Sequence, residues 1–379
     1  MACANCHGPE VGWTGPVAGN NIRGGVYRGA LPTRFGNRKP PAASCAAFSP
    51  VFSFDPTDHE FVGGNFWDGR ATGERLNPAA EQALGPFLNP VEQNMPDKAA
   101  VWRQVAASKD ARLFEQVWGQ GSLDCSAGGI DLTYDRFGLS IAAFEASTEV
   151  SPFSSTFDDY WTACLAAGNT AEACGEGEGA KETLDPTGIL SEIGWAGLIE
   201  FGEYCSQCHT STEAGPAGLP PLFTNNRFDN IGVPRNPRNP FYDMTTEYLD
   251  DGTPINPDGA SYIDYGLGDF LRTRPEWAHL ALENDGKHRV PTLATSTSGG
   301  ERASRRPTWH NGALKTLEEV VHFYNTRDVP GAGWAGPEVD RNVNRELFEG
   351  KPLGNLELAD EAERAIVAFL KILTDQSKP

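Results

Sequence analysis

Apolar residues recur at helical spacing in three segments of the chain, 137–147, 189–204 and 359–374. A repeat of about 3.6 residues predicts helices that bury one face. The apolar positions are Leu139, Ala142, Ala143 and Phe144 in the first segment, and Leu190, Ile193, Leu198 and Phe201 in the second. Strand-like patterns occur only in short pieces. The chain is therefore predicted to be mostly α-helical.

Glycine and proline are dense between these predicted helices. Residues 8–90 contain too many of them for regular helices, and the same composition predicts long irregular loops at 210–262 and 328–356. The polar stretch 176–182 has the composition of a linker. We therefore place a domain boundary near residue 184.

The sequence Cys-x-x-Cys-His occurs twice, once in each predicted domain. In c-type cytochromes the two thiols bind the vinyl groups of a haem and the histidine supplies an axial nitrogen to the iron. The residues concerned are Cys3, Cys6 and His7 in the first copy and Cys205, Cys208 and His209 in the second. The alternatives are an all-cysteine zinc site or two disulfides, but zinc-binding cysteine pairs rarely have a histidine directly after them.

These motifs predict two covalently bound c-type haems with His7 and His209 as iron ligands. The predicted fold is mostly α, with two cytochrome c-like haem domains, 1–184 and 185–379, joined and wrapped by long loops. A helix that leads into a haem motif and another that closes the chain are the minimal cytochrome c arrangement, and segments 189–204 and 359–374 supply both.

Charge and hydropathy narrow the range of partners. The formal net charge is −20, which argues against nucleic acid or an anionic membrane surface and favours a neutral or basic redox partner. No apolar run approaches the roughly 20 residues of a membrane span, so no membrane insertion is expected.

The cysteines outside the motifs indicate an oxidising compartment. They are Cys45, Cys125, Cys164 and Cys174. Their even number predicts one or two disulfides, with Cys164 and Cys174 as the pair nearest in sequence. Haem attachment and disulfides together predict a periplasmic protein. Met1 stands two residues before Cys3 with no signal peptide between them, so we expect a processed or trimmed chain or a truncated gene model.

Two segments of the first half carry a family resemblance. Residues 65–71 read Asn-Phe-Trp-Asp-Gly-Arg-Ala, and 81–92 contain Gln-Ala-Leu-Gly-Pro with Glu92 ten residues after Gln82. They resemble the bacterial di-haem cytochrome c peroxidase and MauG family, although the gap from Trp67 to Gln82 is longer here. In the second half, the matching segments are 290–293, 310–312 and 316–324.

The resemblance implies roles for four residues of the first domain. Trp67 matches the tryptophan between the two haems, where an oxidisable indole shortens each electron step. Glu92 matches the carboxylate on the open side of the first haem, which moves a proton between the oxygens of peroxide. Gln82 and Pro86 match its neighbours in that pocket. The alternatives are a core aromatic at position 67 and a surface carboxylate at position 92.

The first haem is expected to be open at rest. Standard peroxidases of this family have a distal histidine before a Gly-Pro-Arg-Asn-Ser-Pro segment, and the corresponding residues 28–41 contain none. The remaining histidine of this domain, His59, stands among acidic residues and is expected on a solvated loop.

Tyr324 is the candidate sixth ligand of the second haem. A capping pair, Thr316 and Glu319, predicts a helix from Leu317, whose buried stripe includes Tyr324 while His322 points elsewhere. The resemblance supports this, because typical peroxidases have a ligating methionine fourteen residues after the position of His310, and MauG has a tyrosine there. The alternative is a core tyrosine bonded to the backbone.

The family's calcium site is in doubt here. Lys39 stands where the family has asparagine, and Arg305 replaces a threonine. Cationic side chains at these places would substitute for the charge of the metal. The Arg-Asn pair that normally follows the Thr-Leu motif is also missing after Leu293.

Three functions are compatible with these features. The first is a peroxidase that reduces hydrogen peroxide with electrons from a small cytochrome or cupredoxin, passed from the second haem to the first. The second is a MauG-like enzyme that stores two oxidising equivalents in a bis-ferryl-type state and oxidises aromatic residues of a partner protein. The third is an electron-transfer cytochrome with two inert, six-coordinate haems.

Overall fold

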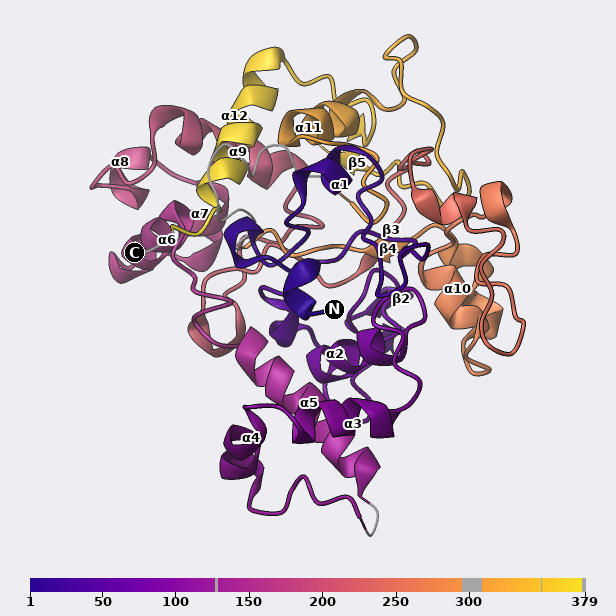
Figure 1. The fold of residues 1–379 in the computed structure, drawn as a ribbon. Helices are drawn as coiled ribbons and strands as arrows, with labels where there is room; N and C mark the ends of the chain where they lie inside the picture. Colours follow the sequence, from indigo (N-terminus) through magenta and orange to yellow (C-terminus); the bar gives the residue numbers. More distant parts are fainter. Residues whose placement is uncertain (127–128, 295–308, 349, 377–379) are drawn as a thin grey trace.

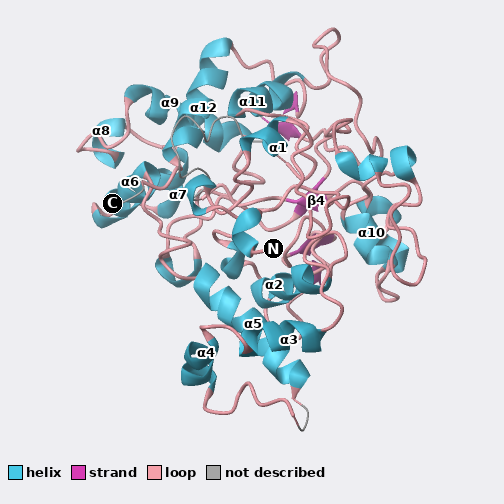
Figure 2. Ribbon diagram, in the orientation of Figure 1, coloured by secondary structure: helices cyan, strands magenta, loops and turns pink. Residues whose placement is uncertain are grey.

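The computed structural model describes residues 1–126, 129–294, 309–348 and 350–376, and their regular secondary structure is mostly helical with a few short strands (Figures 1 and 2). The helices are α1 (Ala18–Ile22), α2 (Pro78–Leu88), α3 (Lys98–Ala106), α4 (Ala111–Trp118), α5 (Ile130–Glu145), α6 (Thr156–Ala166), α7 (Ala171–Glu176), α8 (Lys181–Leu184), α9 (Glu192–Tyr204), α10 (Leu267–Arg272), α11 (Leu317–Thr326) and α12 (Asp360–Ile372).

Three antiparallel two-stranded pairs make up the sheet structure of the described residues. They are β1 (Ser53–Asp55) with β2 (Glu60–Val62), β3 (Phe228–Asp229) with β4 (His288–Arg289), and β5 (Leu347–Phe348) with β6 (Lys351–Pro352). Each strand has only two or three residues, as the sequence predicts.

Helix α2 corrects the prediction that 8–90 lacks regular helices. Asn77 caps its first turn by accepting a hydrogen bond from the Ala80 amide, and Pro78 occupies the first helical position, where a missing N–H costs nothing. The helix packs on α5, and a Cβ atom on Gly138 of α5 would stand only 2.6 Å from the Ala80 carbonyl oxygen. Glycine is therefore required at this crossing.

The second half is built around α9 and α12, which pack closely in the upper part of Figure 1. A Cβ atom on Gly197 of α9 would stand 2.0 Å from the Ala365 carbonyl oxygen, so only glycine allows this approach. Both helices were predicted, but α9 begins at Glu192 and turns Ile193 toward solvent, with 50% of its surface exposed. Trp195 is buried in the core in place of Ile193.

Helices α6 and α7 belong to the same core as α9 and α12. Phe157 and Trp161 of α6 are buried against Phe201 and Phe369, and the predicted disulfide between Cys164 and Cys174 ties α6 to α7. The boundary at residue 184 stays a prediction, and this packing favours a division before α6. Cys45 and Cys125 are buried and take part in no disulfide, so one disulfide forms, between Cys164 and Cys174.

No helix in the described part of the chain has the length and apolar character to cross a membrane.

Candidate functional site

Each Cys-x-x-Cys-His motif lines its own cavity. The first cavity has a volume of about 360 Å³ and contains Cys3, Cys6 and His7. The second has a volume of about 310 Å³ and contains Cys205, Cys208 and His209. Because the four motif cysteines lie in two cavities and all are free, the structure excludes both a single four-cysteine zinc site and a disulfide within either motif.

The backbone of each motif forms a tight turn that directs the histidine inward. The His7 amide donates to the Cys3 carbonyl at 2.9 Å, and the His209 amide donates to the Cys205 carbonyl at the same distance. In the second copy this turn directly continues α9, whose last residue is Tyr204.

Both motif histidines have the form that an iron ligand needs. His7 Nδ1 lies 2.9 Å from the Trp13 carbonyl oxygen, and His209 Nδ1 lies 2.8 Å from that of Phe223. A carbonyl oxygen only accepts, so each Nδ1 carries the proton and each Nε2 keeps its lone pair for the metal. Burial also lowers the pKa of both rings and keeps them neutral. These residues fit a haem in each cavity.

Trp67 lies between the cavities and lines both of them. Its indole N–H donates to the Lys39 carbonyl at 2.8 Å, and its ring meets His310 edge to face with centroids 6.4 Å apart. The Lys39 amide in turn donates to the His310 carbonyl at 2.6 Å. These bonds fix the indole at the wall that the two cavities share.

Helix α2 and the turn after it bring the other predicted residues to the first cavity. Gln82, Pro86 and Glu92 all line it. Pro86 has no N–H, so it cannot bond the Gln82 carbonyl one turn earlier. The Gln82 side-chain oxygen is buried and has no hydrogen-bond partner among the described residues. It is therefore available to a molecule in the cavity.

Glu92 is a partly buried carboxyl held by one local bond. The Asn89 side-chain amide donates to its Oε1 at 2.6 Å. Burial raises the pKa of the carboxyl, while Arg70 and the Asn89 bond act in the opposite direction. A raised pKa makes this carboxylate a better proton acceptor, which suits it to accept a proton and return it.

The second cavity is lined by the helix stripe predicted from the sequence. Leu317, Val320, Val321 and Tyr324 of α11 all face it, whereas His322 is exposed and bonds Glu363. The Tyr324 hydroxyl makes no hydrogen bond to the described residues, which speaks against the backbone-bonded alternative. Burial raises the pKa of this phenol, so it releases its proton only where a cation takes the proton's place.

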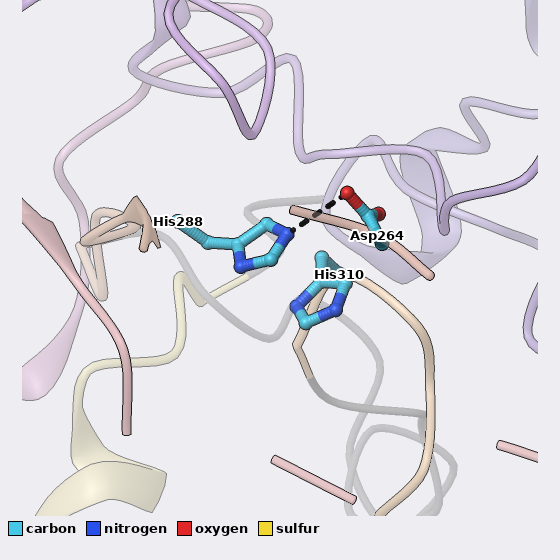
Figure 3. A group of neighbouring side chains, drawn as sticks. All are labelled: Asp264, His288 and His310. Atoms are coloured by element: carbon cyan, nitrogen blue, oxygen red, sulfur yellow. Dashed lines mark ion pairs between the residues drawn. The ribbon is translucent and has the colours of Figure 1, made fainter. Parts of the chain in front are cut away.

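Asp264, His288 and His310 cluster beside the second cavity, as Figure 3 shows. The cluster has the residue types of a metal site, and one ligand atom of each residue lies within 4.8 Å of the others. The two imidazole rings stack in parallel, with centroids 3.5 Å apart and planes within 4°, so their in-plane lone pairs cannot converge on one ion. Arg38 already donates to both oxygens of Asp264, at 2.7 and 2.6 Å. A guanidinium therefore occupies the place of a cation.

A family model described as di-haem cytochrome c peroxidase matches residues 1–164. The methylamine utilization protein MauG of Paracoccus denitrificans (strain Pd 1222) is 32% identical over 388 residues, which span 99% of this chain and 84% of that protein. The chain belongs to the di-haem cytochrome c peroxidase and MauG family.

Other relatives of this family carry the peroxidase name. Cytochrome-c peroxidase IdrP1 of Denitromonas iodatirespirans is 29% identical over 173 residues, or 45% of this chain and 36% of that protein. The crystal structure of a Tyr-to-Met variant of the diheme peroxidase BthA from Burkholderia thailandensis E264 superposes with a TM-score of 0.70 at 25% identity, covering 99% of this chain and 81% of that one.

As a member of the di-haem cytochrome c peroxidase and MauG family, the chain is a haem-dependent oxidoreductase with two covalently bound c-type haems. The residues that the motifs single out for iron ligation and haem attachment line the two cavities.

Sequence reasoning did not find Asp264 and His288, because only the folded chain brings them to Arg38 and His310. Arg305 lies outside the described residues, and Lys39 lines both cavities. Weakened calcium binding at the family's site stays a prediction.

Proposed function

We propose that this enzyme reduces hydrogen peroxide at the haem attached to Cys3 and Cys6, with electrons from the haem attached to Cys205 and Cys208. In this proposal, each cavity is the haem site of one of two cytochrome c-like domains. The observation that carries it is the position of Trp67 in the wall shared by a cavity with Glu92 and a cavity with Tyr324.

When bound, the first haem supplies an iron that binds peroxide and accepts electrons. Glu92 takes the proton of the nearer peroxide oxygen and returns it to the departing oxygen, which leaves as water. The unpaired Gln82 oxygen accepts a hydrogen bond from the peroxide and orients it. Two electrons and two protons complete the reduction of one peroxide to two waters.

The first cavity has no second histidine to compete with peroxide. Of the described residues that line it, His7 is the one histidine, and His59 is an exposed residue of the β1–β2 turn that faces Glu283. Cyanide or azide is therefore expected to bind one haem readily and the other hardly at all. Optical titration measures this, and two equal binding haems, or none, would contradict the assignment of the open site.

Oxidation of a partner protein is the second candidate function. Tyr324 favours it, because a phenolate that ligated the second iron would stabilise its high oxidation states, and both haems could then share two oxidising equivalents. The 32% identity to MauG over almost the whole chain points the same way. The partner in either case is a protein with a neutral or basic surface, and we place the enzyme in the periplasm.

One spectroscopic experiment separates these functions. The ferric protein is expected to show a high-spin component that one equivalent of peroxide removes. Without a reductant, a peroxidase of the standard type leaves the second haem unchanged, whereas a MauG-like enzyme loses intensity at both haems. Two low-spin haems that ignore peroxide would mean an electron-transfer cytochrome and would overturn the proposal.

A further inference from the structure

Arg289 is a cation in the wall of the second cavity and has no acidic partner among the described residues. It is the last residue of β4, and its main-chain amide donates to the Trp67 carbonyl at 2.9 Å. The residue is partly buried, and it lines the second cavity but not the first. Burial lowers the pKa of the guanidinium to about 10, and no carboxylate in the described part of the chain offsets this effect.

The hydrogen bonds of Arg289 use only some of the N–H donors of its guanidinium group. Nη2 donates to the Ser49 hydroxyl at 3.1 Å and to the Asn226 side-chain oxygen at 2.6 Å. Both acceptors are neutral. Nε is buried and has no acceptor among the described residues. Burying a charge without a counter-ion is costly, so an anion in the cavity is the missing partner.

Other buried arginines of the described chain have the acidic partner that Arg289 lacks among these residues. Arg38 pairs with Asp68 and Asp264, Arg34 with Glu247, and Arg327 with Asp328. Each of these guanidinium groups has a carboxylate from the protein. Arg289 is the exception, and it lines the second cavity, which holds a haem.

We propose that Arg289 binds a propionate of the haem attached to Cys205 and Cys208. Haem carries two carboxylates, and the planar guanidinium fork matches a carboxylate in geometry and charge. The residue is a positioning residue. It holds this edge of the second haem on the side of the cavity where its own backbone is bonded to Trp67, and so fixes the haem toward the proposed electron route.

The test is potentiometry of both haems in the holoenzyme. Arg289→Gln leaves a propionate without its cation, which favours ferric over ferrous iron, so the potential of the second haem should fall while that of the first stays at the wild-type value. Arg289→Lys keeps the charge but not the fork, and should restore part of the shift. Arg227→Gln is the control, because Arg227 pairs with Asp58 and Glu60 outside both cavities.

Resonance Raman spectra give a second measurement independent of turnover. In Arg289→Gln the propionate bending mode of the second haem should shift, and in Arg227→Gln it should not. An unchanged second-haem potential in Arg289→Gln, or a shift confined to the first haem, overturns the proposal. Should the Gln variant fail to fold, Arg289→Lys decides: a lowered second-haem potential supports the assignment, and equality with the wild type refutes it.

Discussion

Replacing Glu92 with glutamine is expected to slow peroxide turnover by about 100-fold or more, the usual contribution of a positioned acid-base group. Glutamine keeps the side-chain oxygen that accepts the 2.6 Å bond from Asn89, so the turn after α2 should stay in place. Haem content and the resting spectrum should therefore match the wild type. Steady-state kinetics with a reduced cytochrome donor measures the effect.

A second carboxyl in the same cavity is the alternative acid-base group, and its variant serves as a comparison for Glu92→Gln. Glu145, the last residue of α5, lines the first cavity near Cys3, and burial raises the pKa of its carboxyl to about 8. It lies on a different element from Gln82 and Pro86. If Glu145→Gln showed the large loss while Glu92→Gln turned over at the wild-type rate, the acid-base role would belong to Glu145.

Replacing Tyr324 with methionine is expected to raise the reduction potential of the second haem. A neutral thioether stabilises ferrous iron better than an anionic oxygen does, so the haem should come to resemble a His/Met cytochrome. The variant should also lose any state in which both haems share two oxidising equivalents, while the first reaction with peroxide stays largely intact. Potentiometry beside the wild type gives the answer.

The matched control is Tyr324→Phe, which keeps the aromatic ring against Trp309, 5.8 Å away between centroids, and removes only the oxygen. It should leave the second haem five-coordinate and able to bind cyanide. An unshifted couple in the methionine variant, together with a low-spin second haem in the phenylalanine variant, would reduce Tyr324 to a packing residue. The MauG-like function would then lose its main structural support.

Short-range signals in the sequence predicted the parts of the fold that form locally. Thr316 accepts a hydrogen bond from the Glu319 amide at 3.0 Å, and α11 begins at Leu317 as expected. Asn77 and Pro78 carry an equally local start signal, yet the overall composition of 8–90 predicted no helix there. That prediction was wrong because a proline in the first turn is compatible with a helix.

Contacts between distant parts of the chain could not be predicted in this way. Arg38 and Asp264 are 226 residues apart, and no periodicity links them. The parallel stack of His288 on His310 likewise depends on how β4 and the turn before α11 meet. Tyr324 was predicted from the buried stripe of one helix together with the family resemblance, and Gln82 was predicted from the resemblance, whose motifs are short and local in the sequence.

The bond from the Trp67 indole to the Lys39 carbonyl limits what can happen to Trp67 in the proposed route. An amide oxygen is too weak a base to take the indole proton, so an electron that leaves the ring leaves a charged radical behind rather than a neutral one. No proton then has to travel and come back for each electron that crosses. Electron transfer between the haems then depends on electronic overlap and on the fixed dipoles around the ring. The proton transfers of catalysis are confined to the side of Trp67 where Glu92 lies.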